Sequence, residues 1–319
     1  MSKHLEPVYR WGERWSRVGV LTILIFLIIL RVFRPEINLS IQLVIALAAL
    51  LIGIPHGAID HLISIPAQPR SRFFAFIIIY IIIAVVAGWF IAHWNVLGFQ
   101  CVVVMSALHF GYGDASFRNE ENDAKSRERN SFPIESAYAL PAGFVPVVLP
   151  LTDHRTLSAL TRIHPALQNW AGTWVHTLRL VTLASSAVGL VSLLAAKKFS
   201  LCIDLILLMA LALIAPPLIA FATYFGLWHA LRHTARLVSK LPKADGLART
   251  GNWKGAILGA ITPGLYAIFG TLAIATILMV RSPGAFSSSL LWTTLVIIWA
   301  LTVPHMATTA RFDWKTLHK

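Results

Sequence analysis

Long apolar runs recur along nearly the whole chain, and they constrain its fold more than any other feature. Each run is about as long as a helix needs to cross the hydrocarbon core of a bilayer. Inside a bilayer every backbone polar group needs a partner within the protein, and a helix provides one. We therefore expect an all-α polytopic membrane protein with about ten transmembrane helices, over residues 18–33, 38–56, 73–92, 96–113, 133–150, 173–195, 200–215, 218–236, 255–280 and 289–306.

No polar stretch between these runs is long enough to fold alone. Of the 319 residues 57% are hydrophobic and 13% are charged, whereas soluble domains usually carry about 25% charged residues. The consecutive prolines Pro216 and Pro217 cannot continue a straight helix, so we place a break between the seventh and eighth spans there. The expected organisation is an N-terminal cytoplasmic tail over 1–17, one transmembrane domain over 18–306, and a C-terminal cytoplasmic tail over 307–319.

The charges predict how the spans are oriented. The net charge is +13, from 27 Lys and Arg against 14 Asp and Glu. In a soluble protein this excess would suggest nucleic acid, but membrane proteins collect basic residues in cytoplasmic loops, so we expect no nucleic-acid partner. With the N-terminus inside, twenty Lys and Arg fall in inside segments and five in outside segments. This split predicts ten spans in the inner cell membrane with both termini cytoplasmic, and residues 116–131 as a solvated cytoplasmic loop.

Five histidines lie at or near the ends of apolar spans: His56, His109, His229, His233 and His305. The four spans that carry them all run from outside to inside, so these side chains are expected at one depth, near the cytoplasmic face. A lone intramembrane histidine is usually a packing residue, but ionisable residues within a bilayer are costly and mark function. We interpret the group as a shared metal site. His229 and His233 are four residues apart, which places both on one helical face.

Two carboxylates follow these histidines closely in the sequence: Asp60 comes four residues after His56, and Asp114 five after His109. A carboxylate hydrogen-bonded to a ligating imidazole fixes its tautomer and raises its basicity. We therefore expect Asp60 and Asp114 to support the site, although a helix cap or an interfacial residue is an equally ordinary reading of each. His61 is five residues from His56 and points away from it on an ideal helix, so it is left out.

The donor set and its surroundings narrow the chemistry without deciding it. A set of imidazoles with no carboxylate bound directly to the metal suits zinc, copper, iron or nickel. A site within the membrane implies a lipophilic substrate. Aromatic residues beside the histidines could line an apolar tunnel, although for each one alone ordinary packing is the simpler interpretation. They are Phe110, Tyr112, Phe221, Tyr224, Phe225 and Trp228.

Four segments resemble the Brp/Blh family of β-carotene 15,15′-dioxygenases: residues 55–60, 109–114, 216–233 and 302–306. They occur in the family's order, and the segment 216–233 is the most specific of them. The resemblance implies that 18–306 is a catalytic domain and that a non-haem Fe²⁺ is held by His56, His109, His229 and His233. It also implies cleavage of the central double bond of β-carotene by O₂, giving two all-trans-retinal. His305 matches a family motif outside the four ligands, so the resemblance gives it a supporting role.

Other functions remain open at this level. A membrane desaturase or other di-iron oxidase usually carries about eight histidines in HxxxH and HxxHH boxes, and this chain has one HxxxH and no HxxHH. A metal transporter would spread His and Asp along a conduit rather than gather them at one depth. A structural haem or zinc protein is the least specific alternative. If retinal is the product, it would leave into the lipid bilayer, where a rhodopsin-type apoprotein could take it up.

Overall fold

The computed structural model describes residues 3–33, 37–64, 70–281 and 288–317, and within these ranges every regular element is helical. The long helices are α1 (Glu6–Phe33), α2 (Leu39–Gly57), α4 (Arg70–His93), α5 (Asn95–Ala124), α6 (Phe132–Leu151), α8 (Val175–Ala195), α9 (Phe199–Ile214), α13 (Trp253–Arg281) and α14 (Ser288–Leu317). The short elements are η1 (Lys3–Leu5), α3 (Asp60–Ser64), α7 (His154–Ile163), η2 (Pro165–Asn169), η3 (Gly172–Trp174), α10 (Pro217–Thr223), η4 (Tyr224–His229), α11 (Ala230–Val238) and α12 (Pro242–Arg249).

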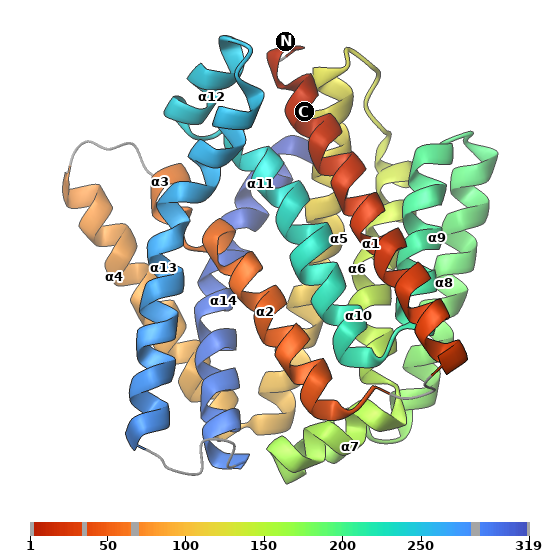
Figure 1. Cartoon of the computed structure of the whole chain (residues 1–319), viewed down its shortest axis with the longest axis vertical. Coiled ribbons are helices and arrows are strands. Elements are labelled where there is room, and N and C mark those ends of the chain that lie inside the picture. Colours follow the sequence, from red (N-terminus) through yellow and green to blue (C-terminus); the bar gives the residue numbers. More distant parts are fainter. Residues whose placement is uncertain (1–2, 34–36, 65–69, 282–287, 318–319) are drawn as a thin grey trace.

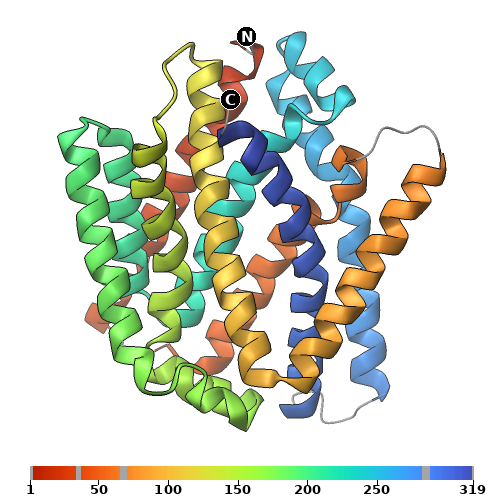
Figure 2. The same cartoon turned by 180° about the vertical axis from the view of Figure 1, so that it is seen from behind.

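The long helices pack side by side into one bundle (Figure 1). Helix α1 begins and α14 ends at the same end of the bundle, where α12 also lies, and α7 lies across the opposite end (Figures 1 and 2). The segment formed by α10, η4 and α11 runs through the middle of the bundle, between α2 and α1 in the view of Figure 1, with α5 behind it. This segment carries His229 and His233, so the predicted site lies inside the bundle rather than on its surface.

The surface of the bundle is that of a membrane protein. Among the described residues, six helices are long and apolar enough to cross a bilayer: Lys3–Val32, Arg70–His93, Asn95–Ala124, Phe132–Leu151, Gly172–Ala195 and Trp292–Leu317. Shorter apolar helices cover Val44–Gly53 and Phe199–Ile214. Large apolar side chains on α4, such as Ile78, Ile82 and Val85, are more than half exposed. A soluble protein rarely exposes such a continuous apolar surface, whereas lipid covers it at no cost.

Two segments that were expected to lie outside the spans are helical and packed. Helix α1 begins at Glu6, inside the segment expected as the N-terminal tail, and α5 continues to Ala124 through most of the predicted 116–131 loop. Ser116, Arg118 and Glu121 are buried. The cause is pairing across helices: Arg118 donates to Glu13 of α1 at 2.8 Å. A buried charge that has a partner of opposite sign no longer needs water.

The break at the paired prolines is confirmed. Helix α9 ends at Ile214, Pro216 is extended with φ −54° and ψ 141°, and α10 begins at Pro217. What the sequence did not predict is η4, a π-helical segment between two α-helical ones. π-Helical turns are rare and occur often at functional sites. Here η4 ends on His229 itself.

Candidate metal centre

Four of the five predicted histidines come together, from three parts of the bundle. His109 is on α5, His229 ends η4, His233 is on α11 and His305 is on α14. The ring centres of His109 and His229 are 5.1 Å apart, and those of His109 and His305 are 5.3 Å apart. His229 stacks on His233 at 5.6 Å, and His233 lies 5.9 Å from His305. The four imidazoles thus form one cluster, although the sequence separates them by up to nearly two hundred residues.

His56 is the fifth member of the predicted group. It lies in the last turn of α2, and its side chain is outside the described part of the structure. Its neighbour Gly57 faces the cluster: a methyl group placed on Gly57 would lie 3.5 Å from Nδ1 of His305. The C-terminal end of α2 therefore reaches the histidine cluster.

Asp60 contacts His305 of the cluster, while the side chain of His56, with which it was expected to pair, lies outside the described part of the structure. Helix α2 ends at Gly57 and α3 begins at Asp60, so the four-residue spacing from His56 does not lie along one helix. The carboxylate oxygens of Asp60 lie 2.9 and 3.0 Å from Nδ1 of His305. The hydroxyl of Thr309 on α14 lies 3.0 Å from Nδ1 of His109 on α5. Sequence reasoning missed Thr309, although it lies one helical turn after His305 on α14.

Asp114 does not serve His109 as expected. The two residues share the continuous helix α5, where five residues turn the chain by about 140° from one side chain to the other. Asp114 accepts a hydrogen bond from the indole of Trp228 at 2.7 Å and lies 3.9 Å from Arg232. Arg232 in turn stacks over the Trp228 ring at 3.6 Å. Asp114 and Trp228 therefore belong to a buried polar cluster with Arg232. Asp114 had been expected to support the metal site, and Trp228 to line a tunnel.

Other predicted aromatic residues do border the histidines. Phe110 lies 4.6 Å from His229 and 5.3 Å from His109, between ring centres. Phe225 and Tyr224 stack along His229 at 6.2 and 6.4 Å, and Phe221 stacks on Phe225 at 6.1 Å. Tyr112 is half-buried and packs against the main apolar core. The histidine cluster thus has an apolar aromatic wall on the side of η4.

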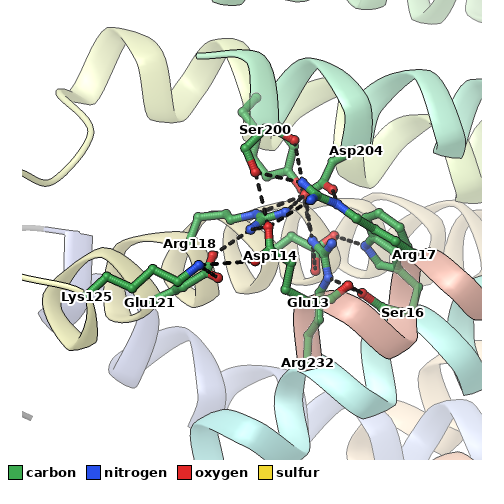
Figure 3. Close-up of polar contacts among 12 residues, drawn as sticks. Glu13, Ser16, Arg17, Asp114, Arg118, Glu121, Lys125, Ser200, Asp204 and Arg232 are labelled. Carbon is green, nitrogen blue, oxygen red and sulfur yellow. Dashed lines mark hydrogen bonds and ion pairs between the residues drawn. The ribbon is translucent and has the colours of Figure 1, made fainter. Parts of the chain in front are cut away.

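A buried ionic cluster lies on the other side of the same helical segment (Figure 3). Its centre is Asp204 of α9, which is fully buried. Asp204 accepts hydrogen bonds from Arg17 at 2.8 Å, Arg118 at 2.9 Å, Arg232 at 3.0 Å and the hydroxyl of Tyr138 at 3.1 Å. The sequence signal for this cluster is a lone aspartate, Asp204, inside an apolar run.

A second set of ion pairs closes the end of the bundle next to His233. Arg236 lies 3.0 Å from Glu120 and 2.8 Å from Asp313, and Tyr9 donates to Glu120 at 3.1 Å. Residues 307–317, which were expected to be part of a C-terminal tail, are helical, and Asp313 and Thr316 are buried. A small hollow reaches the histidines here, lined by Ile63, His233, Arg236, Leu237, Lys240, Thr309 and Phe312.

The chemistry of the donor set fits a transition metal, while the side-chain positions are not those of a closed site. Among the described residues, no group of three His, Cys, Asp or Glu side chains is arranged to hold a metal ion. Imidazoles that bind an ion at about 2.1 Å have ring centres about 4.6–5.9 Å apart for ordinary ligand angles. The measured separations of 5.1–5.9 Å fall in this range.

Comparison with known proteins shows to which family the chain belongs. The sequence profile of the β-carotene 15,15′-dioxygenase family matches residues 47–313. The chain belongs to this family. Its members are oxygenases, so the histidine cluster lies in an enzyme, and all four motif segments fall inside the matched range.

Two relatives give the scale of the similarity. The chain is 27% identical over 271 residues to a β-carotene 15,15′-dioxygenase from uncultured marine bacterium 66A03, which covers 80% of this chain and 88% of the relative. It is 26% identical over 302 residues to the probable β-carotene 15,15′-dioxygenase Blh of Halobacterium salinarum, which covers 83% and 82% of the two chains. No solved structure matches the chain.

Proposed function

We propose that this enzyme holds one ferrous ion through His56, His109, His229 and His233 and cleaves the central 15,15′ double bond of β-carotene with O₂. The products are two molecules of all-trans-retinal. One carotene and one dioxygen supply every atom of both products, so the reaction needs no further co-substrate. The observation that supports this proposal is the gathering of His109, His229 and His233 inside an apolar bundle, on helices that carry the family's motifs.

The bound ion would supply the position at which dioxygen is activated. The chain's own residues hold and orient its ligands. Thr309 sets the ring of His109 through Nδ1, and four neutral imidazoles leave the ion its full charge of about +2. His229 is 2% and His233 5% exposed, so water reaches the site poorly. Such exclusion protects reactive intermediates from side reactions.

The aromatic wall suits a hydrocarbon substrate. β-Carotene offers no charge or hydrogen-bonding group, so the protein has to position it by shape and apolar contact. Phe110, Phe221 and Phe225 provide such a surface next to His229. Both β-carotene and dioxygen dissolve in lipid, and retinal would leave into the same bilayer. We propose that a rhodopsin-type apoprotein can take it up there.

The topology that accompanies this proposal has ten spans in the inner cell membrane with both termini in the cytoplasm. It is supported by the charge distribution and by the common end at which α1 begins and α14 ends (Figure 2). Helix α12, with Lys243 and Arg249, lies at that end too, as expected of a cytoplasmic face. A reporter that works only in the cytoplasm should be active when it is fused after residue 319. Activity of a reporter that works only in the periplasm would refute this orientation.

The test of the activity is expression in cells that make β-carotene. Their orange colour should fade while all-trans-retinal accumulates, and a His109→Ala variant made at the same level should leave the colour unchanged. Purified enzyme stripped of metal should regain cleavage with Fe²⁺ and not with Zn²⁺. Apocarotenals of unequal length would refute central cleavage, and activity restored by another metal alone would refute iron.

A further inference from the structure

The contacts of Asp60 single out His305. Asp60 is 2% exposed, and its two oxygens lie 2.9 and 3.0 Å from Nδ1 of His305. The hydroxyl of Tyr80 donates to the same carboxylate at 3.2 Å. The three residues come from α3, α4 and α14, so three separate elements converge to hold one imidazole ring.

The charge of Asp60 is not balanced by a basic side chain. The other buried carboxylates nearby each meet an arginine: Asp204 meets Arg232 at 3.0 Å, and Glu120 and Asp313 meet Arg236 at 3.0 and 2.8 Å. Among the described residues, no Lys or Arg lies within ion-pair distance of Asp60, whose ionic contact is with His305 alone. An isolated buried carboxylate is costly. Its compensating positive charge is therefore expected on or beyond the His305 ring.

The ring of His305 is placed to pass that charge on. A carboxylate at Nδ1 favours the tautomer with the proton on Nδ1, which leaves Nε2 as a donor to a metal. Nε2 of His305 is buried, and its ring centre lies 5.3 Å from that of His109 and 5.9 Å from that of His233. These separations are close to the 5.1 Å between His109 and His229 and the 5.6 Å between His229 and His233. His305 thus lies inside the histidine cluster rather than behind it.

We propose that His305 is a fifth imidazole ligand of the metal, held in place by Asp60 and Tyr80. The proposal rests on the proposed function, because it concerns the same ion. It differs from the supporting role that the motif resemblance implies for His305. The competing arrangement is an imidazolium–carboxylate pair, in which His305 carries the compensating charge itself and binds no metal.

The experiment measures metal binding and ligand number apart from activity. Full-length protein in lipid nanodiscs is titrated anaerobically with Fe²⁺, and X-ray absorption counts the imidazoles on the bound iron. We expect five in the wild type and four in His305→Ala, with affinity lowered at least about tenfold. Asp60→Asn and Tyr80→Phe keep the His305 ring. Asp60→Asn should weaken iron binding less than His305→Ala does, and Tyr80→Phe should weaken it least. His61→Ala is the matched control, because its ring lies against Phe73 at 6.1 Å and should leave both readouts unchanged.

The two levels of the proposal fail in different ways. A wild type that binds no iron would refute the proposed function and the fifth ligand together. A wild type that binds iron through four imidazoles, with the same affinity in His305→Ala, would refute the fifth ligand alone. If His305→Ala does not fold, the imidazole count of the wild type and the affinity of Asp60→Asn still decide the question.

Discussion

The histidine cluster and the ionic cluster lie on different faces of the same helical segment, α10–η4–α11. On one face Arg232 meets Asp204 and Asp114, so each charge has an opposite charge beside it. On the other face the rings of His229 and His233 meet imidazoles and phenyl rings. The first face satisfies itself with residues of the chain, whereas the second collects donors of one kind. A collection of like donors is stabilised by a cation that they share.

The two faces should therefore respond differently to mutation. Removing one partner of a buried ion pair leaves an uncompensated charge and is strongly destabilising, typically by about 3–5 kcal/mol. Removing an imidazole that packs against other rings, such as His109 or His229, takes away ring contacts rather than one partner of a buried ion pair. The difference separates residues that hold the fold from residues that hold the cofactor, and four variants test it.

The largest expected effect is on the histidine face. His109→Ala or His229→Ala should lower iron affinity more than about a hundredfold, because a bond to the ion is lost along with the geometry of the remaining ligands. Retinal formation should fall nearly to zero. The unfolding temperature of the metal-free protein should change little, in contrast to the large loss of iron affinity. His61→Ala is the control, and a histidine variant that keeps its iron and loses its fold would break the comparison.

On the ionic face, Asp204→Asn keeps the shape of the side chain and removes the charge that Arg17, Arg118 and Arg232 share. We expect a loss of about 3–5 kcal/mol in stability, measured by thermal unfolding in detergent. Iron affinity of the folded fraction should stay within about threefold of wild type. Asp153→Asn, at the exposed start of α7, is a matched control with little effect. Normal stability combined with lost iron would show that the two faces are coupled.

The sequence predicted the parts of this arrangement that depend on local spacing. The apolar runs gave the helical membrane architecture, Pro216 and Pro217 gave the break before α10, and the four-residue spacing placed His229 and His233 on one face. The failures all involve contacts between distant residues. The loop predicted over 116–131 is mostly helix, because Arg118 finds Glu13 and Asp204 on other helices.

The supporting residues could not be assigned from spacing either. The spacing of His56 and Asp60 suggested one continuous helix, which is wrong, because α2 ends at Gly57, α3 begins at Asp60, and the carboxylate meets His305. Asp114 was paired with His109 by nearness in the sequence, although helical geometry turns it toward Trp228. Each error came from treating neighbours in the chain as neighbours in space.

The smallest expected effect concerns Trp228, which the sequence placed on the substrate side and the structure places on the ionic side. Trp228→Phe keeps an aromatic ring under Arg232 and removes the indole donor to Asp114. A hydrogen bond to a charged group contributes about 1.5–3 kcal/mol, so the free energy of unfolding should fall by this amount or less. Iron content and the ratio of retinal to other products should not change. Phe225→Leu, on the wall beside His229, is the comparison variant and should lower cleavage with little effect on stability. If Trp228→Phe instead altered the products at unchanged stability, the ring at this position would contact the substrate. Trp228 would then belong to the histidine face and not to the ionic face.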